Sequence, residues 1–513
     1  MHDVPASWDD GLSPPTAGEP SDAGDPYEAL SSYESSIRQG AADPATLANY
    51  GVLLWRLYQF RQGGEAFGRV VDDPRADAAM LRRVARCYFE IGRFGRAAEV
   101  MRIALARMAG ADAMTINTLA WTLERDHQTD EARHYAQAAH AADKTYGPAV
   151  RLLAHLDRRT GDLERAEARL VDQLRQYPTD FDWGLLYELA AVRDRLGRYD
   201  EAWNALCEAK SHLATAAASH LRDSYFIRRR QWELAQAVTG ADLTRWRRAG
   251  DALQPPKRIA FLTGFPRSGT TLLEQIIASH PDAIDTDESG ILSRQFIEPL
   301  VWKAADALSA IIELRSFYAA QLIAGRDAFF QWTENYLDQP IGGRLLIEKN
   351  PLLTPDLPLA MRLFPEASLL VALRDPRDVV LSYLFTMVPL NWSSAPAIDV
   401  AEACQFYADA MRHWLLWRRR LDEGWCEVRY EQVVADAPGE TKRVAACLGV
   451  DWDPAMLDER RRSERRAVRT PTYDDVTKPL YTRAVGRWQN YERHLRPGLR
   501  LLQPYLEAFE YAR

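Results

Sequence analysis

The residues best placed for chemistry lie in a short loop at positions 264–271, with the sequence GFPRSGTT. An apolar run at 259–262 precedes this loop, and apolar residues recur with helical spacing after it. A strand, a tight loop and a helix in this order place backbone N–H groups and a positive helix end around an anion. We therefore predict a phosphate-binding loop made of Pro266, Arg267, Ser268, Gly269, Thr270 and Thr271.

One position separates this loop from those of common nucleoside triphosphatases, which read Gly-x4-Gly-Lys-Ser/Thr. Thr270 stands where the lysine belongs, and Arg267 is the only cation in the loop sequence. The loop therefore favours a ligand that carries phosphate, but it lacks the usual lysine for a γ-phosphate. A kinase or nucleoside triphosphatase stays open as an alternative at this point.

Three more segments pair a short apolar run with a polar residue at its end: 345–348 with Lys349, 368–373 with Arg374, and 426–429 with Tyr430. We expect these runs to be parallel strands that alternate with helices, so that their carboxyl ends meet at one edge of a sheet. The forked guanidinium of arginine matches phosphate or sulfate. Such a sheet is expected to bring together four cations, Arg267, Lys349, Arg374 and Arg429.

In this order the segments resemble the sulfotransferases that use 3′-phosphoadenosine-5′-phosphosulfate (PAPS), above all the tyrosylprotein sulfotransferases and the bacterial repeat-containing group. The resemblance covers nearly all of the C-terminal half and includes the segment 470–491. It implies that residues 266–271 bind the 5′-phosphosulfate. It also implies that four residues bind the rest of the nucleotide: Arg374 and Ser382 at the 3′-phosphate, with Tyr430 and Arg487 in contact with the same molecule.

The resemblance further implies three catalytic residues. Lys349 and Arg267 would offset the negative charge that grows on the bridging oxygen as the S–O bond breaks, an effect that is often the largest catalytic contribution. Glu288, in the acidic run 285–289, matches the glutamate that takes the proton from the acceptor hydroxyl. No metal ion is expected, because the ten histidines show no metal-ligand spacing and the loop lacks the usual Lys-Ser/Thr pair.

Three positions depart from the resemblance. No histidine follows Lys349, which separates the chain from the small-molecule sulfotransferases and favours Glu288 as the base. Gly486 stands in place of a helper serine, and Thr386 stands in place of an arginine four residues after Ser382. These two changes keep a second alternative open, a repeat scaffold that binds nucleotide without turnover.

The region that precedes these segments, from about residue 27 to 225, repeats with a period of about 34 residues. A turn followed by an alanine recurs, and the alanines are Ala66, Ala97, Ala132, Ala166 and Ala202. Twelve positions earlier stand Leu54, Ala85, Ala120, Ala154 and Ala190. Small residues at both places let paired helices approach closely. The pattern resembles tetratricopeptide repeats, which stack into a superhelix with a concave surface that often binds peptides.

Composition limits the class of protein. The chain has 513 residues, 47% hydrophobic and 27% charged, which is ordinary for a globular protein of two or more domains. Its net charge of −8 argues against general binding to nucleic acid, and no apolar run is long enough to span a membrane. The N-terminus lacks the features of a signal peptide, and five scattered cysteines suggest reduced, buried thiols. We therefore expect a cytoplasmic protein.

The sequence thus predicts an α + α/β fold, with an N-terminal all-α superhelix of tetratricopeptide repeats and a P-loop-type α/β sulfotransferase domain around a central parallel sheet. The expected limits are a disordered tail at 1–25, the repeats with their connector at 26–240 and the sulfotransferase domain at 257–513. We expect an acceptor hydroxyl on a polypeptide bound by the repeats, with protein tyrosine as the first candidate. A glycan, lipid or metabolite acceptor stays open, and a homo-oligomer is compatible with the repeats.

Overall fold

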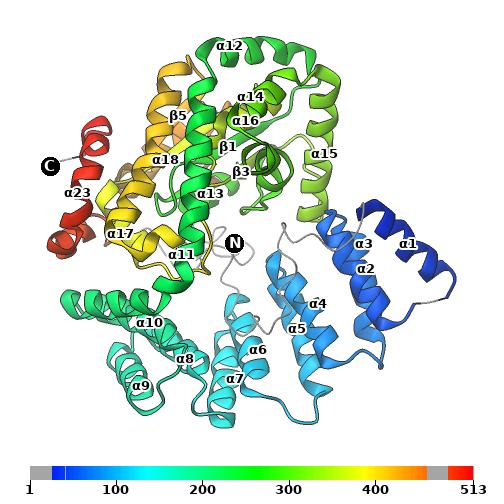
Figure 1. Ribbon diagram of the computed structural model, residues 1–513, viewed down its shortest axis with the longest axis vertical. Helices are drawn as coiled ribbons and strands as arrows, with labels where there is room; N and C mark the ends of the chain where they lie inside the picture. The colour runs from blue at the N-terminus through cyan, green and yellow to red at the C-terminus, as the bar shows by residue number, and fades with distance from the viewer. Residues whose placement is uncertain (1–25, 41, 459–482, 512–513) are drawn as a thin grey trace. The chain divides into compact units, whose positions relative to one another are not determined.

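In the first part of the chain, helices pair into consecutive hairpins (Figure 1). The structure, a computed structural model, describes residues 26–40, 42–458 and 483–511. The tail expected at 1–25 lies outside these residues. The helices of this part are α1 (Pro26–Arg38), α2 (Pro44–Arg56), α3 (Phe60–Asp72), α4 (Ala78–Glu90), α5 (Phe94–Ala106), α6 (Ala113–Arg125), α7 (Thr129–Ala142), α8 (Gly147–Thr160), α9 (Leu163–Gln176), α10 (Asp182–Arg195) and α11 (Tyr199–Ala237).

Small residues pack between the two helices of each hairpin, from α2/α3 to α10/α11. The positions twelve residues apart that the sequence singled out are buried in every hairpin, as in the pairs Ala120 and Ala132, or Ala154 and Ala166. A methyl side chain on each helix leaves the two backbones free to approach closely, because no longer side chain separates them. The prediction of tetratricopeptide-type repeats is confirmed.

Each hairpin turn contains one residue with a left-handed backbone. Gly92, Gly161 and Gly197 have φ angles of 75°, 88° and 74°. Tyr58 and His127 hold the matching places in the other two turns, with φ angles of 59° and 61°. Glycine adopts this region without strain, so the three glycines explain why the chain turns where the sequence indicated.

The first helices of three hairpins begin at an aspartate. Asp43, Asp77 and Asp112 each accept a hydrogen bond from the backbone N–H three residues further on, at 2.9, 2.8 and 2.6 Å. Such a side chain satisfies an N–H group that has no partner inside the helix. The start of these hairpins is therefore encoded locally, before any helix packs on another.

The chain divides into two compact units, one of residues up to His212 with Asn335–Gln339, the other of Leu213–Glu334 with Pro340–Arg513. The division falls inside α11, a single helix of 39 residues. The stretch that leads to the sulfotransferase domain expected at 257–513 consists of the end of α11, then α12 (Gly240–Ala249) and a 3-10 turn at Gly250–Ala252. The domain limits drawn from the sequence stay predictions.

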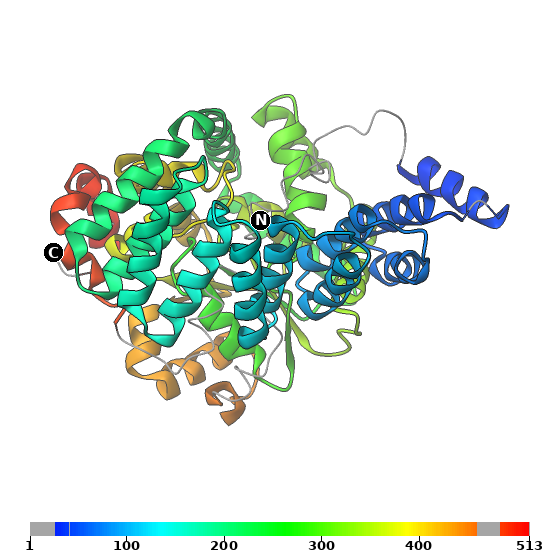
Figure 2. The same ribbon diagram turned by 90° about the horizontal axis from the view of Figure 1, so that it is seen from below.

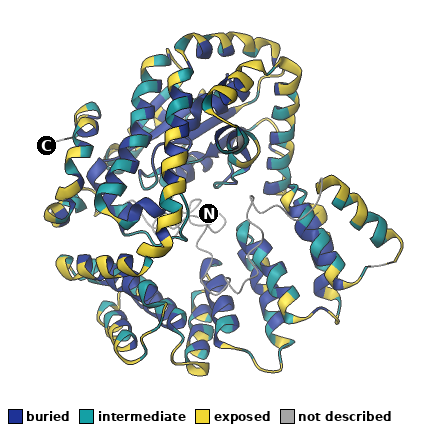
Figure 3. Cartoon of the chain, viewed as in Figure 1, coloured by how far each residue is buried: buried dark blue, intermediate teal, exposed yellow. Residues whose placement is uncertain are grey.

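The second unit is built around a five-stranded sheet with the strand order β2-β3-β1-β4-β5, and all neighbouring strands are parallel. Its strands are β1 (Ile259–Thr263), β2 (Ala283–Asp285), β3 (Leu345–Lys349), β4 (Ser368–Leu373) and β5 (Trp425–Arg429). The central strands β1 and β3 are buried along their whole length (Figure 3). Parallel strands covered on both faces read as continuous apolar runs, which is why β1, β3 and β4 were predicted. Buried and partly buried residues alternate in the edge strand β5, which was also predicted.

Helices pack against this sheet in the second unit (Figure 2). Leu273, Ile276 and Ile277 of α13 lie in one hydrophobic cluster with strand residues and with Val444 and Leu448 of α20. The α-helices of this unit after α12 are α13 (Thr270–Ala278), α14 (Ala307–Ser316), α15 (Ala319–Leu337), α16 (Leu357–Leu363), α17 (Pro376–Leu384), α18 (Val400–Arg420), α19 (Tyr430–Ala435), α20 (Ala437–Leu448) and α23 (Glu492–Ala508). Short 3-10 or π segments lie at Ser293–Ile297, Pro299–Lys303, Thr354–Asp356, Ala395–Ile398, Pro454–Leu457 and Arg487–Tyr491.

Candidate active site

The phosphate loop predicted from the sequence joins β1 to α13, and two glycines fix its shape. Gly264 and Gly269 have φ angles of 153° and 93°. A Cβ atom at Gly264 would overlap the carbonyl oxygen of Ala372 in β4, and one at Gly269 would lie 2.8 Å from the ring of Tyr430. The backbone therefore lies directly against its neighbours, and any larger residue would push the loop away from them.

The loop ends where α13 begins, which places the N-terminus of a helix beside it. Ser268, Thr270 and Thr271 are buried, whereas Pro266 and Arg267 are partly exposed. The N–H groups of the first helical turn have no partner within the helix and carry partial positive charge. This arrangement suits a phosphate or sulfate group.

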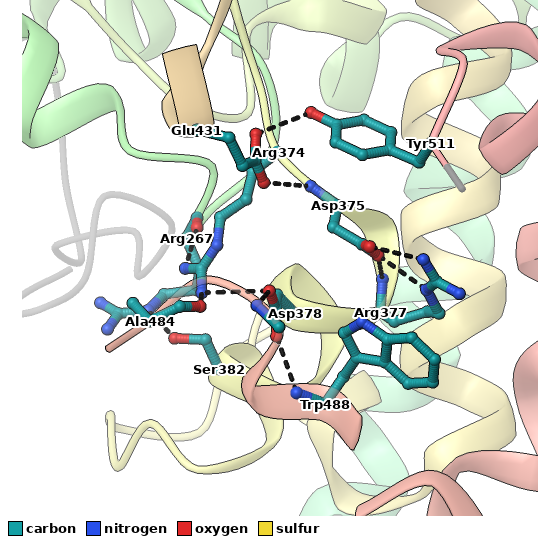
Figure 4. Close-up of polar contacts among 11 residues, drawn as sticks. Arg267, Arg374, Asp375, Arg377, Asp378, Ser382, Glu431, Ala484, Trp488 and Tyr511 are labelled. Carbon is teal, nitrogen blue, oxygen red and sulfur yellow. Dashed lines mark hydrogen bonds and ion pairs between the residues drawn. The ribbon is translucent and has the colours of Figure 1, made fainter. Parts of the chain in front are cut away.

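Arg267, Arg374 and Ser382 come together beside the loop (Figure 4). The Nε of Arg267 donates a hydrogen bond to the Oγ of Ser382 at 2.9 Å. Arg374 donates to the carbonyl oxygen of Arg267 at 3.2 Å and to that of Ala484 at 2.5 Å. Its guanidinium lies over the ring of Tyr430, 5.0 Å from the centroid. The structure thus brings these four predicted residues together, and their binding roles stay predictions.

A buried aspartate ties α17, the helix that carries Ser382, to the C-terminal segment. Asp378 accepts hydrogen bonds from the N–H groups of Gly486 at 2.7 Å and Trp488 at 2.8 Å (Figure 4). Burial raises the pKa of Asp378 above its ordinary value. The guanidinium of Arg377 covers the Trp488 ring at 3.8 Å from its centroid. These contacts hold the start of α17 in place next to the loop.

Two predicted cations have other neighbours. The guanidinium of Arg487 lies over the ring of Phe385, 4.7 Å from its centroid, just beyond the end of α17. Arg429 pairs with Glu510 at 3.5 Å and lies over the ring of Tyr511 at 5.3 Å. The expectation that Arg429 joins the other cations stays a prediction, and the contacts of its side chain are with an acidic and an aromatic residue near the C-terminus.

Lys349, the last residue of β3, contacts three carboxylates. Its Nζ lies 2.8 Å from Oε2 of Glu274, 3.1 Å from Oε1 of Glu288 and 3.7 Å from Oδ1 of Asp287. The side chains of Lys349 and Glu274 are fully buried, whereas those of Asp287 and Glu288 are partly exposed. Two of the predicted catalytic residues, Lys349 and Glu288, are therefore in direct contact.

Burial and charge act in opposite directions on this cluster. Burial disfavours the charged form of Lys349, but the carboxylates of Glu274, Glu288 and Asp287 outweigh it and hold the pKa of Lys349 above its ordinary value. Burial raises the pKa of Glu274, and nearby acidic groups raise it further against the attraction of Lys349. The lysine is therefore charged at neutral pH.

Glu274 and Glu348 belong to this cluster, and the sequence did not single them out. Burial raises the pKa of Glu348 to about 7, although Thr286 donates a hydrogen bond to its Oε2 at 2.9 Å. Glu274 follows apolar residues in α13, and Glu348 follows apolar residues in β3. An acidic side chain inside an otherwise apolar run is the signal that could have found both.

Asp287 and Glu288 reach Lys349 from a turn that follows β2. Their φ angles are 44° and 59°, a region that residues with side chains rarely adopt. Just before them, Thr286 donates its N–H to the carbonyl of Ile347 at 3.2 Å and so extends the pairing of β2 with β3. Backbone strain of this kind persists where the surrounding contacts fix the conformation. The position of Glu288 is therefore set by the sheet.

The region that contains the phosphate loop is similar to known proteins. Residues 260–454 match the model of the sulfotransferase family. This region belongs to the sulfotransferase family. The prediction of that family from the loop, the strand ends and the C-terminal segment is confirmed.

Individual relatives are about a quarter identical to the chain over the residues that align. Protein-tyrosine sulfotransferase 2 of Gallus gallus is 23% identical over 244 residues, which cover 45% of this chain and 62% of the relative. An uncharacterised protein of Aquifex aeolicus (strain VF5) is 24% identical over 336 residues, 63% of this chain and 42% of the relative. The chain therefore spans less than two thirds of the length of both proteins.

One similar solved structure is the sulfotransferase domain from the Synechococcus PCC 7002 olefin synthase. It matches 46% of this chain and 95% of its own length, with 21% identity and a TM-score of 0.28.

Two departures noted in the sequence have structural substitutes. Thr386, at the place of an arginine, donates its hydroxyl to the carbonyl of Ser382 at 2.7 Å. Gly486, at the place of a serine, has a φ angle of 73° and donates its N–H to Asp378. Both residues therefore stabilise the backbone near the site through contacts that do not require the family's side chains.

His280 is a structural residue at the end of α13, as the sequence indicated. Its Nδ1 accepts the N–H of Asp282 at 3.0 Å, and its Nε2 lies 2.8 Å from the carbonyl oxygen of Asp451. The basic run 459–466 and the family-like residues 470–481 lie outside the described part of the chain.

Among the described residues, no group of three or more His, Cys, Asp or Glu side chains is arranged to hold a metal ion. No single described helix has the length and apolar character to cross a membrane, although α14 and α15, bent by 96°, pass this test of length and composition as a pair.

Proposed function

We propose that this chain is a PAPS-dependent sulfotransferase, which transfers a sulfuryl group to an acceptor hydroxyl. One observation carries the proposal: β1, which leads into the phosphate loop, lies between β3 and β4. Lys349 with its carboxylates stands at the end of β3, and Arg374 follows the end of β4. The loop therefore has a proton-accepting group on one side and an anion-binding group on the other.

The basic side suits a nucleotide with separate phosphate groups on its 5′ and 3′ positions. Residues 266–271 offer backbone N–H groups to the 5′ end. Arg374 and Ser382 offer a guanidinium and a hydroxyl to the 3′-phosphate, which ATP lacks. Arg374 donates to backbone carbonyls in this structure, and a charged phosphate oxygen is a stronger acceptor than a carbonyl. An arriving 3′-phosphate is therefore expected to take over these donors.

The acidic side suits activation of the acceptor. When bound, PAPS supplies an electrophilic sulfur and a phosphate leaving group. Glu288 accepts the proton of the acceptor hydroxyl as the new O–S bond forms. Lys349, kept charged by its carboxylate neighbours, stabilises the negative charge that appears on the leaving oxygen, and Arg267 adds to this effect from the loop.

We further propose a polypeptide acceptor, with the hydroxyl of tyrosine as its reactive group. The similarity to a protein-tyrosine sulfotransferase supports this choice, and a repeat array suits an extended ligand better than a small metabolite. Transfer of labelled sulfate to peptides that differ only in Tyr, Phe or Ser at one position tests it. Label in the Phe or Ser peptide alone contradicts a tyrosine acceptor. A cytoplasmic location is part of the proposal, and fractionation of cells that express the tagged chain tests it.

Calorimetry with 3′,5′-ADP and with ATP separates this proposal from a kinase or nucleoside triphosphatase. We expect tighter binding of 3′,5′-ADP. Arg374→Ala should weaken it by more than tenfold, since a charged hydrogen bond contributes roughly 2 kcal/mol. Arg429→Ala is the matched control, because Arg429 also lies at a strand end but pairs with Glu510. Tighter binding of ATP, or equal losses in both variants, contradicts the nucleotide assignment.

Turnover under saturating nucleotide tests the role of Lys349. Lys349→Ala should lower kcat by about a hundredfold or more while the affinity for 3′,5′-ADP changes little, because the charge that Lys349 meets exists only in the transition state. Lys349→Arg keeps the positive charge and controls for the loss of the buried ion pair with Glu274. A normal kcat in a folded Lys349→Ala protein would remove Lys349 from the mechanism.

A further inference from the structure

Two cysteines, Cys426 and Cys447, face each other beside the sheet. Cys426 lies in β5, the edge strand, and Cys447 lies in α20, which packs against it. Cys426 is a buried member of the hydrophobic cluster under α13, and Cys447 is a partly buried residue packed against the same cluster. A thiol on each of two packed elements is the arrangement that a disulfide between them requires.

The guanidinium of Arg443 lies beside this pair of cysteines. Arg443, one helical turn before Cys447 in α20, donates from one terminal nitrogen to the Sγ of Cys426 at 2.7 Å. Its other terminal nitrogen donates to the carbonyl of Glu427 at 2.8 Å and pairs with Glu440 at 2.6 Å. The cation is therefore held against Cys426 from two directions, and the sulfur has a positive group on one side and a second thiol on the other.

These neighbours change the ionisation of the thiol. A hydrogen bond from Cys447 lowers the pKa of Cys426 to about 7; burial opposes the shift, and the charge of Arg443 supports it. Burial instead raises the pKa of Cys87 and of Cys404 to about 12 each. The thiolate is the reactive form of cysteine, so Cys426 differs from the other buried thiols in the property that governs reactivity.

None of the five cysteines forms a disulfide in the structure. We propose that Cys426 and Cys447 are an oxidation site, at which a hydroperoxide converts the two thiols into a disulfide between β5 and α20. This inference is independent of the proposed sulfuryl transfer. It assigns a chemical role to two side chains that neither the phosphate loop nor the carboxylate cluster uses.

The reaction has two steps. The sulfur of the Cys426 thiolate attacks one oxygen of hydrogen peroxide; the O–O bond breaks, the leaving hydroxide takes a proton to become water, and Cys426 becomes a sulfenic acid. The sulfur of Cys447 then attacks the Cys426 sulfur; an S–S bond forms, the S–O bond breaks, and the hydroxide leaves with the proton of Cys447 as a second water. The two sulfurs lose two electrons in total, and the peroxide gains them.

The experiment treats the full chain with one equivalent of hydrogen peroxide at neutral pH, then denatures it and labels free thiols with a maleimide. We expect a mass loss of two hydrogens and a decrease from five labelled cysteines to three, mapped by digestion to Cys426 and Cys447. Cys207 is the matched control, since it is exposed and oxidation by exposure alone would select it. Cys207→Ser should leave the mass loss unchanged, whereas Cys426→Ser and Cys447→Ser should abolish it.

Two further variants distinguish loss of the oxidation site from misfolding of a variant. In Cys447→Ser the sulfenic acid on Cys426 has no second thiol, so dimedone should trap it there. Arg443→Ala should slow the oxidation of Cys426 several-fold at neutral pH, because loss of the guanidinium raises the thiol pKa and lowers the fraction of thiolate. Five labelled cysteines after peroxide, a mass loss that persists in Cys426→Ser, or a disulfide that maps to Cys207 would each overturn the proposal.

Discussion

At the scale of single residues, the cations of the site have different neighbours. Arg374 donates to two backbone carbonyls, whereas Lys349 contacts three carboxylates. A carbonyl leaves the charge of a guanidinium available to a phosphate, but carboxylates offset the charge of a lysine. We therefore expect Arg374 to act mainly in nucleotide binding and Lys349 mainly in turnover.

Glu288→Gln should remove most sulfuryl transfer while 3′,5′-ADP still binds. Glutamine keeps the size of the side chain but cannot accept the proton of the acceptor, and a general base contributes a factor of roughly 10² to 10⁴ in rate. Initial rates with labelled PAPS and calorimetry measure the two quantities separately.

Asp287→Asn is the control for this change, because its carboxylate lies next to Glu288 and contacts the same Nζ at 3.7 Å in place of 3.1 Å. It should retain much more activity than Glu288→Gln. If Asp287→Asn is the more damaging substitution, Asp287 is the base and the alignment with the family glutamate is displaced by one residue.

Single residues also mark the limit of what the sequence could predict. Arg267, Arg374 and Ser382 were predicted to meet, because each has a clear place at a strand end or helix start. Glu274 and Glu348 were not predicted, since their role depends on burial next to Lys349, and burial is a property of the packed sheet. The meeting of Arg429 with the other cations stays a prediction, because its contacts in the structure are with Glu510 and Tyr511.

At the scale of elements, apolar runs and repeated small residues were sufficient to predict most strands and the helical repeats. The strands β1, β3, β4 and β5 agree with the runs found in the sequence to within a residue. For β1, β3 and β4 the reason is that a strand buried on both faces needs apolar residues along most of its length. β2 was missed, since three residues are too few to show a period. The left-handed backbone at Tyr58 and His127 could not be predicted either, because these two turns have no glycine at that position.

Gly269→Ala and Gly161→Ala form a pair that separates backbone strain from steric contact. Both glycines have similar φ angles, 93° and 88°, so both substitutions should cost about 1 kcal/mol of stability from strain. A Cβ at Gly161 meets nothing within 4 Å, whereas one at Gly269 meets the Tyr430 ring at 2.8 Å. Chemical denaturation of both variants measures the strain.

Only Gly269→Ala should also weaken 3′,5′-ADP binding, because the added methyl group displaces Tyr430 or the loop. Calorimetry of the two variants side by side measures their affinities for 3′,5′-ADP. Unchanged affinity in Gly269→Ala would show that the loop shape tolerates a side chain and that Tyr430 is not held against it for binding.

At the scale of the whole molecule, buried carboxyls make stability depend on pH. Burial raises the pKa of Glu348 from 4.5 and that of Asp356 from 3.8 to about 7 each. A raised pKa means that the folded chain binds these protons more tightly than the unfolded chain does. The contribution of each group is therefore most favourable below its unfolded pKa and is lost as the pH rises through about 7.

Glu348→Gln should remove one part of this pH dependence. A shift from 4.5 to about 7 corresponds to roughly 3 kcal/mol. Between about pH 4 and about pH 8 the free energy of unfolding of Glu348→Gln should therefore move by roughly this amount in its favour, relative to the unsubstituted protein. Urea denaturation at several pH values measures it. Glu423→Gln, which changes a glutamate with 80% side-chain exposure, should leave the pH profile unchanged; parallel profiles for all three proteins contradict a raised pKa at Glu348.

The carboxylates around Lys349 also couple nucleotide binding to proton exchange with the solvent. A phosphate or sulfonate group that arrives beside Lys349 repels the carboxylate of Glu274, whose pKa burial already raises, and so raises this pKa further. The complex therefore takes up protons that the free protein lacks. The buffer supplies these protons, and its heat of ionisation enters the measured enthalpy of binding. At one pH, two buffers of very different ionisation enthalpy should therefore report different binding enthalpies for 3′,5′-ADP, and Glu274→Gln should reduce the difference. Binding of the nucleotide and binding of protons are then linked, and the affinity for 3′,5′-ADP falls as the pH rises.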